Sequence, residues 1–71
     1  MWVQTSAATR FNTDQWASYF TKQINQTWEL HCNANGVEVT LAKHLSQVQA
    51  DAKIKQIDDG LKAGTVFINI S

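Results

Sequence analysis

Two alternating runs of apolar and polar residues flank the dipeptide Asn35-Gly36, and this feature restricts the fold more than any other. Asn-Gly readily takes the positive φ angles of a type I′ turn, and strict alternation is typical of a half-buried strand. The sequence therefore predicts a β-hairpin with strands over 27–33 and 37–43.

The register of this hairpin follows from the same pattern. A two-residue loop brings three pairs of apolar residues together: Ala34 with Val37, Cys32 with Val39, and Leu30 with Leu41. A slip by one residue would set each of them against a polar partner. The turn residues and the apolar pattern thus predict the same register.

A helix is predicted over 46–62. Ser46 and Gln49 have the spacing of a capping box, in which each side chain binds the backbone near the other residue. The apolar residues that follow recur along one helical stripe: Ala50, Ile54, Ile57 and Leu61. Gly64 is suited to end the helix, and the alternating stretch after it predicts a final strand over 65–70.

The amino-terminal third is open to two interpretations. Residues 2–5 predict a short strand. Residues 16–22 fit a strand that places Trp16 and Phe20 on one face, and their aromatic content favours this reading. They also fit a helix that begins after Thr13 and aligns Trp16, Phe20 and Ile24.

Together these elements predict an α+β fold: an antiparallel sheet of four or five strands with one amphipathic helix packed on one face. Residues 1–71 are expected to form a single small domain. The predicted core consists of the inward-facing apolar residues of the strands and the helix: Val3, Trp28, Leu30, Cys32, Val37, Val39, Leu41, Ile54, Ile57, Leu61, Val66 and Ile68.

Length and charge restrict the class of protein. A domain of 71 residues buries only about 60% of its unfolded surface, so association with a second chain is an expected source of stability. Six basic residues balance six acidic ones and are scattered, which disfavours nucleic-acid binding.

No stretch approaches the ~18 apolar residues of a membrane span. The single cysteine excludes an internal disulfide and suits a reducing cytoplasm.

The neighbours His31 and Cys32 are the first candidates for chemistry. On a strand their side chains point to opposite faces, so Cys32 is predicted to lie in the core and His31 to face solvent beside Thr40. This geometry excludes a Cys/His nucleophile pair. His31 and His44 would lie about 13 Å apart at ~3.3 Å per residue, too far to share a metal ion.

No other residues form an evident catalytic group. Asp58 and Asp59 are adjacent on the predicted helix and point about 100° apart. Neither has a clear acid/base partner. We therefore expect no enzyme activity, no catalytic residue, no cofactor and no metal ligand.

The aromatic residues and the final strand point instead to an interface. Three Trp, three Phe and one Tyr exceed what one thin core would hide, and aromatic residues on the uncovered face of a sheet would form an apolar patch typical of partner surfaces. The last strand carries no charge and no proline, so as an edge strand it would be open to pairing. The predicted interface residues are Trp16, Phe67, Val66, Ile68 and Ile70.

These observations favour a small non-catalytic protein-interaction module that forms a homodimer, with a further protein partner still to be identified. One alternative is a nucleic-acid-binding module that stacks bases on exposed aromatic side chains, which would require lysines to gather beside Trp16 or Tyr19. Another is a small-molecule binder with a site between subunits around His31 or His44.

Overall fold

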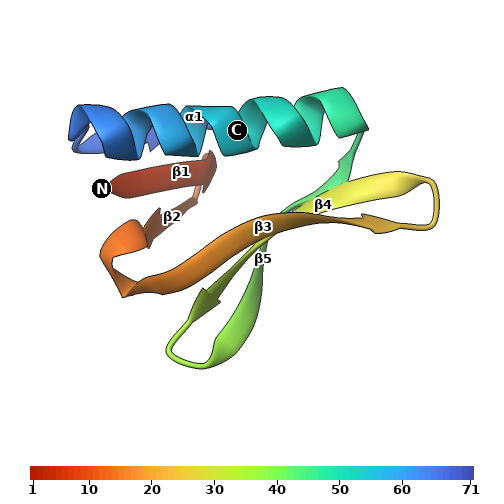
Figure 1. Cartoon of the computed structure of the whole chain (residues 1–71), viewed down its shortest axis with the longest axis horizontal. Helices are drawn as coiled ribbons and strands as arrows, with labels where there is room; N and C mark the ends of the chain where they lie inside the picture. Colours follow the sequence, from red (N-terminus) through yellow and green to blue (C-terminus); the bar gives the residue numbers. More distant parts are fainter.

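The computed structural model describes residues 1–71 and contains six strands, one 3-10 helix and one α-helix. The elements in chain order are β1 (Trp2–Ser6), β2 (Thr9–Asn12), η1 (Thr13–Gln15), β3 (Trp16–Ile24), β4 (Thr27–Ala34), β5 (Val37–Leu45), α1 (Gln47–Ala63) and β6 (Phe67–Asn69). Figure 1 shows α1 along one side of the molecule, with the hairpins of β3, β4 and β5 extending away from it. The predicted α+β class with one helix is confirmed. Neither the length nor the polarity of α1 suits a membrane crossing.

The strands form two three-stranded sheets, which corrects the prediction of a single antiparallel sheet of four or five strands. The first sheet has the order β2-β1-β6, with β1 antiparallel to β2 and parallel to β6. The second sheet, β3-β4-β5, is antiparallel throughout. The chain changes sheet at η1, where the side chain of Asn12 accepts a hydrogen bond from the backbone N–H of Asp14 at 3.1 Å. β2 is absent from the sequence-based prediction because turn-forming residues follow it directly.

The hairpin of β4 and β5 confirms the predicted turn. Asn35 and Gly36 have φ angles of 52° and 78°, as a type I′ turn requires. Ala34 pairs with Val37, and Cys32 pairs with Val39.

Further along this hairpin the register shifts. Leu30 pairs with Ala42 rather than with the predicted Leu41, because the ladder is irregular between Leu30 and His31. Such a β-bulge inserts one extra residue into one of the two strands. Leu41 nevertheless remains in the core, with 6% of its surface exposed.

Residues Trp16–Ile24 form strand β3, so the strand interpretation is confirmed and the helical one is wrong. The pairing of Tyr19 with Cys32 and of Phe20 with His31 places β3 beside β4. The sequence of residues 16–22 fits both a helix and a strand. Pairing with the free edge of β4 decides in favour of the strand, which suits its aromatic residues.

Helix α1 has the predicted cap. The backbone N–H of Gln49 donates to the Ser46 hydroxyl at 3.1 Å, and the backbone N–H of Ser46 donates to the Gln49 side chain at 2.9 Å. Gly64 ends the helix with a φ of 68°. Ala50, Ile57 and Gly60 face the core, and α1 contacts strands of both sheets. The helix therefore packs against both sheets.

The core lies between α1 and the two sheets. Its buried cluster consists of Val3, Leu30, Cys32, Leu41, Ile57 and Ile70, and the prediction included all of these except Ile70. Trp28, Val39, Ile54 and Ile68 are half-buried.

Three predicted core residues are exposed instead: Val37, Leu61 and Val66. Val37 follows the turn at the tip of the β4–β5 hairpin, which Figure 1 shows far from α1, so no second layer covers it. Leu61 lies in the last turn of α1 and Val66 in the connection to β6, where both line a surface pocket.

Candidate functional site

Cys32 and His31 lie on opposite faces of β4. Cys32 is completely buried in the core, and burial raises the pKa of its thiol. A raised pKa keeps the sulfur protonated and therefore poorly nucleophilic. The two side chains do not converge on one cavity, so they do not form a Cys/His pair.

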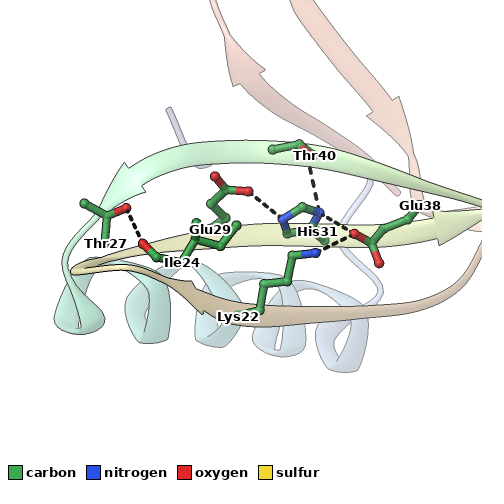
Figure 2. A network of polar contacts seen from close by, with 7 residues as sticks. All are labelled: Lys22, Ile24, Thr27, Glu29, His31, Glu38 and Thr40. Atoms are coloured by element: carbon green, nitrogen blue, oxygen red, sulfur yellow. Dashed lines mark hydrogen bonds and ion pairs between the residues drawn. The ribbon is translucent and has the colours of Figure 1, made fainter.

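His31 is also buried, with only 4% of its surface exposed, which corrects the expectation that it meets solvent. Its Nε2 lies 2.8 Å from Glu29 Oε1, and its Nδ1 lies 3.2 Å from Glu38 Oε2. The ring stacks on Phe20 with the centroids 5.7 Å apart. Figure 2 shows Glu29 of the same strand and Glu38 of β5 beside opposite nitrogens of the imidazole, with Lys22 of β3 reaching Glu38. These side chains cover the imidazole although no second layer of structure lies on this face.

Lys22 completes this group, which we call the polar cluster: Lys22, Glu29, His31, Glu38 and Thr40. Lys22 Nζ donates to Glu38 Oε2 at 2.8 Å, and this hydrogen bond lowers the pKa of Glu38, with a smaller effect from the charge of His31. Thr40 Oγ1 lies 3.4 Å from His31 Nδ1. The cluster ties β3, β4 and β5 together on the face away from α1.

The geometry of the polar cluster does not suit metal binding. The carboxylates of Glu29 and Glu38 approach opposite ring nitrogens of His31, so one ion cannot lie at a coordination distance of about 2 Å from all three groups. No three His, Cys, Asp or Glu side chains are placed to hold a metal ion. His44 is exposed near the end of β5 and takes no part in the cluster.

The two adjacent aspartates of α1 are each bound to a different partner. Asp58 accepts a hydrogen bond from the hydroxyl of Tyr19. This bond, together with burial and the negative charge of Asp58, raises the pKa of Tyr19 to about 12. Asp59 binds Lys55 at 2.8 Å one turn away. The first contact joins α1 to β3, and the second stays within the helix.

Three of the five lysines are bound to other groups of the protein. Lys22 is paired with Glu38, and Lys55 with Asp59, while Lys53 donates to the backbone carbonyl of Ile70. Each of these three lysines is therefore held by another group of the protein and is not free to bind a phosphate beside a stacked base.

One pocket opens on the surface, between the amino-terminal strand and the end of α1. It has a volume of about 410 Å³. Its lining combines apolar side chains with polar groups of the adjoining turns: Met1, Trp2, Asn12, Asp14, Leu61, Gly64, Thr65 and Val66. Trp2, Leu61 and Val66 are exposed by 47%, 43% and 76%.

Phe67 extends this pocket into a larger exposed area. It is the cross-strand partner of Trp2 in the parallel pair of β1 and β6, and 45% of its surface is exposed. We call this area the apolar surface: Trp2, Leu61, Val66 and Phe67. It arises because Val3 and Ile68 of the same strands face the core, and alternation sends Trp2 and Phe67 to the face that α1 leaves uncovered.

The five predicted interface residues fall into two groups. Val66 and Phe67 lie on the apolar surface. Trp16 is half-buried and packs against the core, with its ring 5.9 Å from that of Tyr19. Ile68 is half-buried and Ile70 is buried.

Trp2 and Leu61 belong to the apolar surface but not to the predicted interface. The sequence held a signal for Trp2: it alternates with Val3, so only one of the two could face a core that lies on one side of the strand. No comparable signal marks Leu61, because its helical spacing fits the buried stripe.

Comparisons with known protein families, curated proteins and solved structures find no match to this chain. Its own geometry is therefore the basis on which its function is inferred.

Proposed function

We propose that this chain is a small non-catalytic protein-interaction module that acts as a homodimer through its apolar surface. The observation that carries the proposal is the contiguous exposure of Trp2, Leu61, Val66 and Phe67 beside a pocket of about 410 Å³. Exposed apolar patches of this kind mark partner surfaces in soluble proteins.

Energetics support association through this surface. Burying a large apolar side chain fully contributes about 1.5–3 kcal/mol, and each member of the apolar surface still has a large part of its area in water. In a two-fold dimer every such contact is made twice. A chain of this length also has a small core, so binding to the folded state would add to its stability by mass action.

The state of the reactive groups supports a non-catalytic role. The thiol of Cys32 is sealed in the core, and both ring nitrogens of His31 are engaged by glutamates. We place the protein in the cytoplasm, where a free thiol stays reduced.

The proposal is tested by sedimentation velocity over a range of protein concentrations. We expect the chain to associate, and Val66→Ser to weaken self-association by about tenfold or more because the apolar contact is lost twice. Val48→Ser is the matched control, because Val48 is equally exposed at 78% but lies at the other end of α1. A chain that stays monomeric at high micromolar concentration, or equal effects of the two substitutions, would contradict the proposal.

A further inference from the structure

The two small sheets have four edge strands, and only one of them carries no charge. β2 contains Arg10, β3 contains Lys22, and β5 contains Glu38 and Lys43. Charged side chains on an edge strand discourage another strand from pairing with it. β6, with the sequence Phe67–Asn69, lacks this protection.

The backbone of β6 also has hydrogen-bonding groups that β1 does not use. The backbone N–H of Trp2 donates to the carbonyl of Val66 at 2.8 Å, and that of Ile70 donates to the carbonyl of Gln4 at 2.9 Å. In a parallel pair this pattern directs the N–H and C=O of alternate residues toward the neighbouring strand. The N–H and C=O groups of Phe67 and Asn69 therefore point to the free edge.

Resting on the proposed homodimer, we infer that β6 pairs antiparallel with β6 of a second copy about a two-fold axis at Ile68. Phe67 of each chain then lies opposite Asn69 of the other. Two residues opposed in this way exchange both of their backbone hydrogen bonds. The outward N–H and C=O groups of Phe67 and Asn69 in each copy therefore all find partners in the other copy. The occupant of the edge is a second copy because the three-residue strand is complementary to itself in this register.

The same register suits the side chains. The two Ile68 side chains face each other as a non-hydrogen-bonded pair, in which Cα atoms lie about 4.5 Å apart. They join on the side where Ile68 already packs against the core. Phe67 and Trp2 of each chain lie together on the opposite side, so the Trp2 and Phe67 parts of the two apolar surfaces become continuous. The product is a six-stranded sheet, β2-β1-β6-β6-β1-β2, with α1 of both copies on one face.

A backbone modification tests this pairing without changing a side chain. The chain can be assembled by ligation at Cys32, with a methyl group on the backbone nitrogen of Phe67 that removes the outward N–H and blocks the edge. We expect the dissociation constant of the dimer to rise about 10- to 100-fold, because two symmetry-related hydrogen bonds are lost. The matched control carries the methyl group on the nitrogen of Arg10. Arg10 pairs with Gln4, which uses its own groups toward β6, so the N–H of Arg10 points to the free edge of β2. The control should dimerise like the unmodified chain.

Amide hydrogen exchange of the unmodified protein provides a second readout that does not depend on refolding a modified chain. We expect the amides of Phe67 and Asn69 to become protected as protein concentration rises, while that of Arg10 keeps exchanging rapidly. If the chain dimerises and Val66→Ser weakens the dimer, but these two amides remain unprotected and N-methylation of Phe67 has no effect, the strand pairing is wrong and the apolar interface stands. A chain that is monomeric throughout would overturn both.

Discussion

At the scale of single residues, His31 and Cys32 show how far strand alternation determines an environment. Alternation places Cys32 in the core, and the structure agrees. It also places His31 on the other face, but exposure does not follow from that position. Phe20 of β3, Glu38 of β5 and Glu29 of β4 itself cover the ring, so the burial of His31 comes from its neighbours within the β3-β4-β5 sheet. Strand alternation predicts that His31 faces solvent, but partly exposed polar side chains cover its ring.

The Tyr19–Asp58 contact leads to a pH-dependent prediction at this scale. The pKa of Tyr19 is raised from 10.0 to about 12 in the folded chain, so the folded state favours the protonated phenol. The stability from this contact is fully present below pH 10.0 and is lost as the pH rises through about 12. Because Tyr19 is the only tyrosine, its ionisation can be followed directly by ultraviolet absorbance.

Two adjacent substitutions provide the comparison for this titration. Asp58→Asn removes the negative charge beside the phenol, so the pKa of Tyr19 should fall toward its ordinary value. Asp59→Asn should leave the titration unchanged, because Asp59 pairs with Lys55 instead. Identical titration curves for the two variants would show that Asp58 does not hold the phenol.

At the scale of elements, the β4–β5 hairpin and the capped helix α1 follow from local chemistry. The turn at Asn35 and Gly36 and the capping box at Ser46 each depend on residues within one or two turns of the backbone. The bulge beside Leu30 does not have such a local cause. It lets the hairpin bend, while Leu41 keeps its place in the core.

A substitution at the turn separates backbone conformation from packing. A Cβ atom added at Gly36 would meet nothing within 4 Å, but the φ of +78° is one that L-residues rarely adopt. Gly36→Ala should therefore lower the free energy of unfolding by roughly 1–2 kcal/mol, the typical cost of a left-handed residue. Gly36→Asn should cost less, because asparagine tolerates this region. Urea unfolding measures both, and an unchanged Gly36→Ala variant would argue against the type I′ turn.

At the scale of the whole molecule, α1 joins two sheets that do not pair with each other. Ile57 is buried in the cluster that also contains Val3 of the first sheet and Leu30 of the second. Gly60 lets the helix approach the first sheet closely, because a Cβ there would lie 2.8 Å from the sulfur of Met1 and 3.3 Å from Ile68. The position of the first sheet, and with it the apolar surface, depends on this contact.

Gly60→Ala tests that dependence. In an isolated helix the change would add up to about 1 kcal/mol of stability, but overpacking a close contact typically costs about 1–3 kcal/mol. We expect the variant to be less stable by about 1 kcal/mol in denaturant unfolding, since Met1 is flexible and can yield part of the space. The exposed change Gln56→Ala in the same helix is the control and should have almost no effect. A stabilised Gly60→Ala chain would mean that α1 and β6 do not pack as described.

The exposure of the predicted interface residues followed from the sequence pattern in some cases and from contacts with distant segments in others. Val66 and Phe67 were identified from an uncharged, alternating strand, and both lie on the apolar surface. Ile70 belongs to that strand pattern too, yet it is buried in the core. Leu61 has the spacing of a buried helical residue, yet 43% of its surface is exposed. In each case the residue type was right for either environment, and only its neighbours in space decided between them.

Turn dihedrals, helix capping and strand alternation act between residues close in the chain, and so the β4–β5 hairpin, the limits of α1 and the core position of Cys32 could be derived from residue order alone. Which strands pair is a different kind of question. The parallel pairing of β1 with β6 joins segments far apart in the chain, and it leaves β2, β1 and β6 as a sheet separate from β3, β4 and β5. These contacts are selected by how the apolar faces of all the elements pack around one helix, and no local window of residues contains that information.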